Sequence, residues 1–337
     1  MEIVAADIGG THARFAIAEV ADGRVVAIGA QITMKAADHA SLQLAWQAYG
    51  VAIGRPLPRA AAIAVACPTT GDVLKLTNNP WIIRPALIPD KLGVDRHTLC
   101  NDFVAVGHAV SPSVATAWPT ATLGETGLTH LYGPDRALPP GGVVSIVGPG
   151  TGLGVALLVG SGPVAGGGYR VVATEGGHPD FAPLDSIEDA LLARLRARHN
   201  RVSVERVVAG PGLVAIHATL AAIEGVAVPA LDDQALWTAA LAGDDSLAAA
   251  ALDRFCLSLG SVAGDIALTQ GGFDGVVIAG GLGLRLERHL PRSGFHQRFV
   301  AKGRFETLMA QVPVKLLTYP QPGLYGAAAA FAQEHDR

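Results

Sequence analysis

The stretch Ile3-Val4-Ala5-Ala6-Asp7-Ile8-Gly9-Gly10-Thr11 is an apolar strand that ends in an acidic residue and two glycines, and a second apolar strand follows over residues 13–18. Glycine has no Cβ, so the backbone N–H groups of Gly9, Gly10 and Thr11 can close around phosphate oxygens. Asp7 is placed to hold Mg²⁺, directly or through a bound water. The stretch therefore predicts a strand-turn-strand phosphate loop, although a tight hairpin turn with a capping aspartate also fits it when it is taken alone.

A second copy of this pattern supports the phosphate-loop interpretation. Strand patterns over 143–147 and 155–159 flank Gly148-Pro149-Gly150-Thr151-Gly152-Leu153-Gly154. A third glycine turn, Gly280-Gly281, follows the apolar residues 275–279. Two such hairpins and a later strand-to-glycine turn are typical of the two-lobed ATPase core of sugar kinases, actin and heat-shock ATPases. No G-x-x-x-x-G-K-[ST] motif occurs, so we expect the nucleotide to lie between two lobes that each supply one hairpin.

The composition indicates an α/β enzyme rather than a nucleic-acid-binding protein. A length of 337 residues predicts about two domains. The net charge of -4, without a basic run, does not favour a nucleic-acid partner. Cys67, Cys100 and Cys256 are odd in number and far apart, which argues against a disulfide framework and predicts a reducing, cytoplasmic location.

No membrane association is expected. The start of the chain lacks the basic region of a signal peptide, and Asp7 interrupts its apolar run. Residues 137–169 carry no charge, but their proline and glycine runs break any helix long enough to cross a bilayer. We interpret this segment as a buried hairpin.

The order of patterns predicts a small α/β domain over 1–110 plus 319–337 and a large domain over 111–318. The first has strand patterns at 3–8, 13–20, 24–32 and 60–66 and a helix over about 39–53. Helices over 104–110 and 322–331 are expected to connect the lobes. In the larger, helix-rich second lobe, Ser186 and Asp189 suggest a capping box. The apolar helix over 246–270 is assigned to the core, with Gly260 and Gly264 allowing close approach of a neighbour.

Phosphoryl transfer needs positioning, charge neutralisation and a base for the attacking hydroxyl. Asn101-Asp102, between an extended stretch and a helix, is the best candidate for the base. A carboxylate near a helix N-terminus stays ionised. The alternative is that Asp102 only caps the helix.

Three further segments offer groups that suit a polyol. Glu175-Gly176-Gly177-His178 places an acid and an imidazole on one tight loop, and Thr77-Asn78-Asn79-Pro80-Trp81 combines hydroxyl, amide and aromatic groups. Glu205 is also a candidate, but a glutamate early in a helix commonly just favours the helix dipole. The other residues also have structural alternatives. Glu175 could be a solvated loop charge and His178 a structural histidine, and Asn78-Asn79 could belong to an ordinary asparagine-rich turn.

Together these segments resemble the bacterial ATP-dependent glucokinases, the zinc-free branch of the hexokinase and actin-like superfamily. The resemblance spans nearly the whole chain in order. It includes the motifs quoted above and also Cys67-Pro68-Thr69-Thr70-Gly71-Asp72, Asp180-Phe181-Ala182-Pro183, Gly210-Pro211-Gly212-Leu213 and Lys302-Gly303-Arg304-Phe305. It implies an α/β fold of the actin-like, ribonuclease H-like ATPase class, with a smaller N-terminal lobe.

The resemblance also implies roles for individual residues. Asp102 would take the proton of the glucose 6-hydroxyl, and the other hydroxyls would be held by Asn78, Asn101, Glu175, His178 and Glu205. ATP phosphates would lie on Gly9-Gly10-Thr11 and Gly150-Thr151-Gly152, with Mg²⁺ at Asp7 and adenosine near Gly280 and Gly281. The sequence departs from the family pattern at His12, where asparagine is usual, and at Pro149, where a small residue is more frequent.

The activity expected from this resemblance is phosphorylation of D-glucose by ATP, giving glucose 6-phosphate and ADP. A broader hexokinase, a mannose or amino-sugar kinase, and a sugar-sensing regulator without turnover are the alternatives. Because dimers are frequent in the family, we expect a homodimer.

Overall fold

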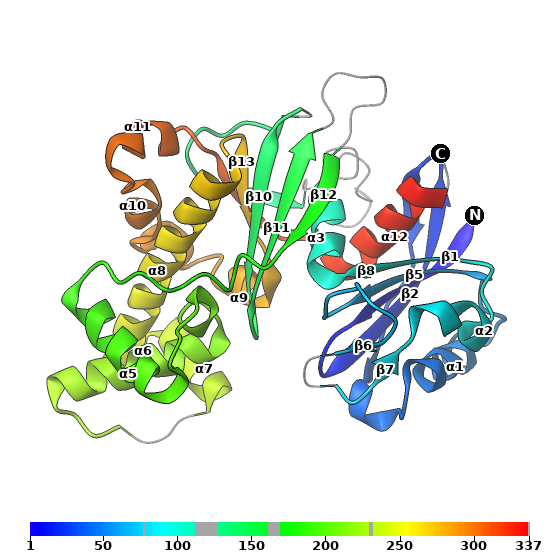
Figure 1. Ribbon diagram of the computed structural model, residues 1–337, viewed down its shortest axis with the longest axis horizontal. Helices are drawn as coiled ribbons and strands as arrows, with labels where there is room; N and C mark the ends of the chain where they lie inside the picture. Colours follow the sequence, from blue (N-terminus) through cyan, green and yellow to red (C-terminus); the bar gives the residue numbers. More distant parts are fainter. Residues whose placement is uncertain (77–78, 112–126, 140, 161–168, 229–231, 336–337) are drawn as a thin grey trace. The chain divides into compact units, whose positions relative to one another are not determined.

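The computed structural model describes residues 1–337 except 77–78, 112–126, 140, 161–168, 229–231 and 336–337. The chain divides into two compact units (Figure 1). Unit 1 comprises Met1–Gly127, Pro163–Ala173 and Tyr319–Arg337, and unit 2 comprises Leu128–Gly162 and Thr174–Thr318.

Unit 1 is built on a mixed sheet of order β3-β2-β1-β5-β8, in which β4 also pairs with β2. Its first two strands form an antiparallel hairpin, whereas β1, β5 and β8 are parallel. The strands are β1 (Glu2–Ile8), β2 (His12–Ala21), β3 (Arg24–Ile28), β4 (Ile32–Lys35), β5 (Ala60–Val65) and β8 (Arg96–Asn101); a separate two-stranded ribbon is made by β6 (Leu74–Lys75) and β7 (Ile82–Ile83).

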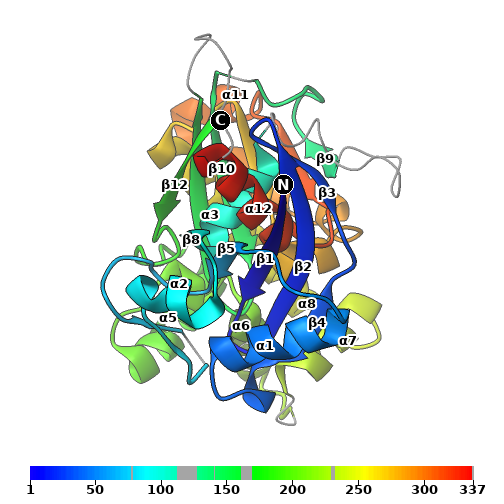
Figure 2. The ribbon, with the colours of Figure 1, turned by 90° about the vertical axis from the view of Figure 1, so that its right-hand side faces the viewer.

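Both faces of this sheet are covered because its central strands are apolar on both sides. On one face, Val4 and Phe15 pack in a cluster with Trp46 and Tyr49 of α1 (Leu42–Ile53). On the other face, α12 (Pro322–His335) lies beside α3 (Asp102–Val110), as Figure 2 shows. The remaining short helices of the unit are η1 (Ala36–Asp38), η2 (Pro85–Leu87) and α2 (Ile88–Leu92).

The predicted strands are confirmed, with one interruption. The pattern over 24–32 gives two strands, β3 and β4, that pair in turn with the same edge of β2. Residues 29–31 separate the two strands, and the Gly29 N–H donates to the Ile17 carbonyl at 2.8 Å. The helix expected from about residue 39 begins at Leu42, because the Ser41 hydroxyl accepts from the Leu44 N–H at 3.3 Å and caps it.

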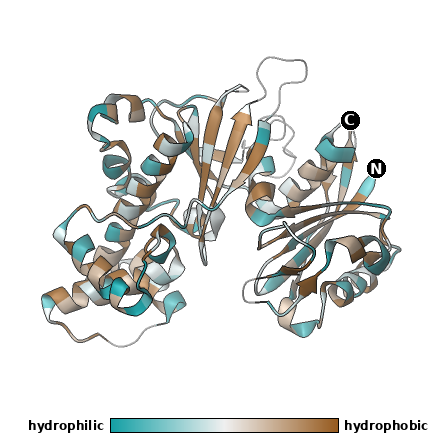
Figure 3. Ribbon diagram, in the orientation of Figure 1, coloured by the Kyte–Doolittle hydropathy of each residue, from teal (hydrophilic) through white to brown (hydrophobic). Residues whose placement is uncertain are grey.

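The second sheet has the order β12-β11-β10-β13-β14-β9, and all of its strands except most of β12 belong to unit 2. Within the uncharged segment 137–169, interpreted from the sequence as a buried hairpin, residues 143–160 form the antiparallel pair β10–β11, and residues 140 and 161–168 lie outside the described part of the chain. Most residues of these strands are hydrophobic (Figure 3). The strands are β9 (Leu128–Tyr132), β10 (Val143–Pro149), β11 (Leu153–Gly160), β12 (Tyr169–Thr174), β13 (Gly275–Ile278) and β14 (Val314–Leu317).

Helices dominate the rest of unit 2, as expected. They are α5 (Ser186–His199), η3 (Val204–Arg206), α6 (Gly210–Glu224), α7 (Asp233–Ala242), α8 (Ser246–Gln270), α9 (Gly280–Arg285), η4 (Leu290–Arg292), α10 (Phe295–Val300), η5 (Gly303–Phe305) and α11 (Glu306–Met309).

Helix α8 is confirmed as a core helix. It is long and apolar enough to cross a membrane, but 67% of its most apolar window is buried inside the protein. A Cβ at Gly264 would lie 2.6 Å from the Phe299 carbonyl oxygen, and one at Gly260 would overlap the backbone of Phe295. The two glycines therefore let α10 approach closely, as predicted.

The capping box at the start of α5 is displaced by one residue from its predicted position. The cap is Asp185, whose carboxylate accepts from the N–H groups of Ile187 and Glu188 at 3.1 and 3.0 Å. Glu188, three residues after this cap, accepts from the N–H of Leu184, the residue before the cap, at 2.7 Å. Arg254 and Arg298 also bind Asp185, so long-range ion pairs select the cap.

Candidate active site

Three of the predicted site residues of unit 1 lie at one edge of its sheet. Asp7 is opposite Ala64 of β5, and Val65 is opposite Asn101 of β8. Because β1, β5 and β8 are parallel, their carboxyl ends meet at the same edge. The strands therefore bring Asp7, Asn101 and Asp102 together, although Asp7 is far from the other two in sequence.

Asp102 is the first residue of α3, and Asn101 is its cap. The Phe103 N–H donates to Asn101 Oδ1 and to Asp102 Oδ1, each at 2.9 Å. Asn101 Nδ2 donates to the Cys67 carbonyl at 3.2 Å, which ties the helix start to the end of β5. The alternative role as a helix cap thus belongs to Asn101, and Asp102 lies in the first turn of the helix.

Two neighbouring acids are electrostatically coupled at this edge. Burial, reinforced by the negative charge of Asp7, raises the pKa of Asp102 to about 6, although the Phe103 N–H opposes the shift. Burial also raises the pKa of Asp7, whereas the Arg14 guanidinium, 3.1 Å from its carboxylate, favours the charged form. At neutral pH Asp102 is therefore mostly ionised, and its carboxylate is more basic than that of an ordinary aspartate.

The chemistry of Asp7 fits the expected Mg²⁺. Magnesium is usually held by one or two carboxylates together with substrate phosphates and waters. Among the described residues no group of three or more His, Cys, Asp or Glu side chains could hold a metal, so a site here would depend on the phosphates. A cation at Asp7 would also offset the repulsion between the two acids.

The β1–β2 turn carries Gly9, Gly10 and Thr11. The Gly9 N–H donates to the His12 carbonyl at 2.9 Å, so His12 closes the turn through its backbone and its side chain is not needed for that. The buried Asn79 donates from Nδ2 to the Gly9 carbonyl at 3.1 Å and accepts from the Trp81 N–H at 2.9 Å.

Asn79 was missed as a support of this turn. The asparagine pair before Pro80-Trp81 was the available signal, but the sequence prediction used only the first of the pair. That residue, Asn78, lies outside the residues that the structure describes, together with Thr77.

The second hairpin that was predicted to bind phosphate joins β10 to β11 in unit 2. Pro149 is opposite Leu153 at the end of the ladder, and the Gly150 N–H donates to the Gly152 carbonyl at 2.8 Å. The Gly150 carbonyl accepts from the Gly210 N–H at 2.8 Å, so the start of α6 supports the hairpin. Thr151 is exposed at the tip. Pro149 thus fits without disrupting the turn.

Glu175 and His178 lie on an exposed turn beside the same hairpin. The His178 N–H donates to the Glu175 carbonyl at 3.0 Å, and His178 Nε2 is 3.8 Å from Glu175 Oε2. A Cβ at Gly176 would lie 2.9 Å from the side chain of Val155 in β11, so the turn packs closely on the strand. The Glu205 N–H donates to the Gly177 carbonyl at 2.9 Å, which brings Glu205 to this turn.

Arg201 fixes the same turn and was missed from the sequence. Its Nη2 donates to the His178 carbonyl at 2.6 Å, and its Nε is 2.7 Å from Asp180 Oδ1. The positively charged residue lies 23 positions from His178, so no local pattern links them.

Gly280 and Gly281 begin α9 after β13. Gly280 has φ of +76°, and a Cβ there would lie 2.7 Å from the Pro149 carbonyl oxygen, whereas one at Gly281 would meet nothing within 4 Å. The structure thus brings Gly280 against the end of β10, next to the phosphate hairpin.

The two glycines should respond differently to the same added methyl group. Gly280→Ala is expected to lower the melting temperature, because alanine is strained at that φ and crowds Pro149. Gly281→Ala should keep the wild-type melting temperature but raise the KM for ATP several-fold, since the free space at Gly281 is the space proposed for adenosine. Thermal melts and ATP titrations measure both. An unchanged KM in Gly281→Ala would contradict the adenosine assignment.

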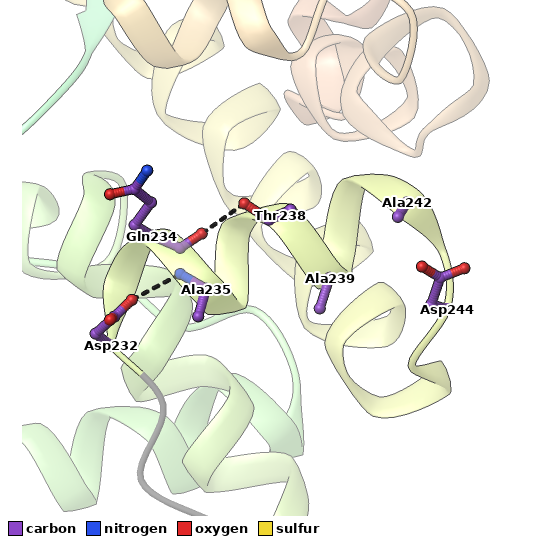
Figure 4. A pocket seen from close by; sticks show the side chains of 7 residues that line it. All are labelled: Asp232, Gln234, Ala235, Thr238, Ala239, Ala242 and Asp244. Carbon is purple, nitrogen blue, oxygen red and sulfur yellow. Dashed lines mark hydrogen bonds between the residues drawn. The ribbon is translucent and has the colours of Figure 1, made fainter.

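A hollow on the surface of α7 contains none of these residues. It is an open depression beside Ala235 and Ala239, with Asp232 and Asp244 at its ends (Figure 4). It offers neither glycine turns nor a convergent set of polar groups, so it is not the candidate site.

The chain is similar to known glucokinases in both sequence and structure. A family model described as Glucokinase matches residues 4–334. The glucokinase of Zymomonas mobilis subsp. mobilis is 61% identical over 335 residues, covering 99% of each chain. The crystal structure of a glucokinase from an Antarctic psychrotroph has a TM-score of 0.80 at 32% identity, covering 98% of each chain.

A more distant structure supports the fold alone. The glucokinase of the ROK family from Streptomyces griseus, solved with glucose and AMPPNP, has a TM-score of 0.58 at 18% identity and covers 98% of this chain and 99% of that one. The predicted actin-like α/β ATPase fold is thereby confirmed. From the match over residues 4–334 and the 61% identity across nearly the whole length, the chain belongs to the glucokinase family.

Proposed function

We propose that this chain transfers the γ-phosphoryl group of ATP to the 6-hydroxyl of D-glucose, giving glucose 6-phosphate and ADP. Family membership supports the reaction, and one observation carries the mechanism. Asp102, at the start of α3, is a carboxylate whose pKa is raised to about 6 by burial and by Asp7. A base with a pKa near the working pH is suited to accept the proton of an attacking hydroxyl.

Further residues of unit 1 and of unit 2 have proposed roles in binding the two substrates. In unit 1, Asn101 binds a sugar hydroxyl beside Asp102, and Asn78 is kept as a further sugar ligand. The turn Gly9-Gly10-Thr11 binds phosphate oxygens. When bound at Asp7, Mg²⁺ neutralises charge on the phosphates of ATP.

In unit 2, Glu175, His178 and Glu205 bind the remaining sugar hydroxyls, and Gly150-Thr151-Gly152 binds phosphates. Gly280 and Gly281 flank adenosine. Arg201 keeps the Glu175–His178 turn in place. The proposal therefore draws substrate groups from each unit.

A coupled assay of ADP release tests the activity. Glucose, mannose and glucosamine would each be offered with ATP, and glucose would also be offered with polyphosphate. We expect the highest kcat/KM for glucose with ATP. Comparable values for the three sugars would indicate a broader hexokinase, and sugar binding without ADP release would indicate a regulator instead.

The rate should fall in mild acid. Since the Asp102 carboxyl must be ionised to accept a proton, its pKa of about 6 in the free enzyme predicts that kcat/KM for glucose is near its maximum at pH 7.5 and about tenfold lower one pH unit below the pKa. Initial rates at glucose concentrations well below KM from pH 5 to pH 8 measure this. A flat profile across that range would remove Asp102 from the role of base.

Three broader assignments are also proposals. The domain limits at residues 110 and 318 and the cytoplasmic location rest on the sequence patterns. A homodimer is proposed from the resemblance to the glucokinase family. Light scattering after size-exclusion chromatography would give the oligomeric state.

A further inference from the structure

The side chain of Glu205 lies against the phosphate hairpin. Its Oε2 accepts from the Leu153 N–H at 2.9 Å, and Leu153 is the residue that follows Gly150-Thr151-Gly152. A Cβ at Gly152 would lie only 2.5 Å from the same Oε2. The carboxylate thus accepts a hydrogen bond from the backbone N–H of Leu153 at the base of the hairpin. It also leaves no room for a side chain at Gly152.

The backbone of Glu205 belongs to a different part of the site. Its N–H donates to the Gly177 carbonyl, and the neighbouring Val204 N–H donates to the Pro179 carbonyl, each at 2.9 Å. Gly177 lies between Glu175 and His178. Glu205 is therefore attached by its main chain to the sugar-binding turn and by its side chain to the nucleotide-binding hairpin.

The attachment through the side chain places the negative charge of Glu205 beside the proposed phosphate site. The backbone N–H groups of a glycine turn favour phosphate because they are donors in a concave arrangement. A carboxylate already hydrogen-bonded to one such group competes for it and has the same sign of charge as the incoming phosphates. A sugar hydroxyl that donates to Glu205 would spread this charge and draw the carboxylate from the Leu153 N–H.

We propose that Glu205 couples the two substrates. Without sugar its carboxylate holds the Leu153 N–H and weakens nucleotide binding; with sugar bound, the hairpin is released and the nucleotide binds more tightly. This inference rests on the proposed function, because it requires Glu205 to contact glucose. Linkage requires the reciprocal effect, so the nucleotide strengthens glucose binding by the same factor.

Calorimetric titration of ADP tests the coupling without turnover. For the wild-type protein we expect saturating glucose to tighten ADP binding about tenfold, within the range of typical coupling factors. Glu205→Gln removes the charge but keeps an oxygen that can accept from Leu153. In the absence of glucose, this variant should bind ADP about tenfold more tightly than the wild type, and added glucose should tighten ADP binding much less.

Two controls keep the test decisive. Glu224→Gln removes the same charge from the exposed end of α6 and should bind ADP as the wild type does. A thermal melt of Glu205→Gln reports whether it is folded. The comparison without glucose does not depend on how well the variant still binds sugar.

The proposal is overturned if Glu205→Gln and the wild type bind ADP equally in the absence of glucose. It is also overturned if glucose leaves the ADP affinity of the wild type unchanged. Either result can occur in an enzyme that phosphorylates glucose normally. Failure of the proposed function itself would instead appear as an absence of ADP release by the wild type in the coupled assay.

Discussion

Asp102→Asn is expected to lower kcat by about 10² to 10⁴-fold, the contribution typical of a general base. The amide cannot accept the proton of the 6-hydroxyl, yet it has nearly the same shape and can still accept the Phe103 N–H through its oxygen. Glucose binding should therefore change little. Steady-state kinetics and a glucose titration measure the two quantities separately.

Asp22→Asn is a matched control for this substitution. Asp22 is exposed in the β2–β3 turn with φ of +53°, a conformation that asparagine tolerates. We expect wild-type kinetics from it. A kcat for Asp102→Asn within a few-fold of the wild type would show that another group accepts the proton.

Asp102→Asn should also stabilise the fold. The pKa of Asp102 is raised from 3.8 to about 6, so the folded protein binds this proton more tightly than the unfolded chain does. Above pH 6 the ionised carboxylate therefore lowers the free energy of unfolding by up to about 3 kcal/mol, at 1.36 kcal/mol per pKa unit. This loss of stability disappears as the pH falls from 6 towards 4. Asp102→Asn should melt at a higher temperature than the wild type at pH 7.5.

Gly326→Ala should have the largest effect on stability. Helices α3 and α12 cross so closely that a Cβ at Gly326 would overlap the backbone of Ala105. The helices must separate to admit it, which we expect to lower the free energy of unfolding by about 3 kcal/mol. Since α3 begins at Asp102, kcat should fall as well. Denaturant unfolding and steady-state kinetics give the two values.

Gly281→Ala serves as the control for stability, because the same methyl group there has free space and φ is not positive. If Gly326→Ala unfolds at the same denaturant concentration as the wild type, the close packing of α3 on α12 is not a constraint on the fold.

Much of this fold could be predicted because local sequence patterns determine its elements. Apolar runs on either side of glycine turns identified β1, β2, β10 and β11, and the apolar composition of α8 identified a buried helix. The order of the glycine motifs then indicated the fold class. The role of Asp102 as a base was inferred from an acid placed between a strand and a helix, and that role stays a prediction; the raised pKa, to which burial and Asp7 contribute, could not be read from the sequence.

The remaining features depend on contacts between distant residues. Asp185 replaces Ser186 as the cap of α5 because two arginines of other helices bind it. Asn79 binds the β1–β2 turn from 70 positions away, and Glu205 binds the residue after the β10–β11 turn from 52 positions away. Neither link has a signature in the surrounding sequence, since each is created by the folded arrangement of strands and turns.

Unit 1 is built from separate segments of the chain, which has a consequence for synthesis on the ribosome. The central strand β1 of its sheet, Glu2–Ile8, is translated long before α12, which covers one face of that sheet and begins at Pro322. At roughly 5–20 residues per second, the apolar face would wait on the order of tens of seconds for its cover. Chaperones that shield nascent apolar surface should therefore associate with unit 1 until translation reaches its last helix.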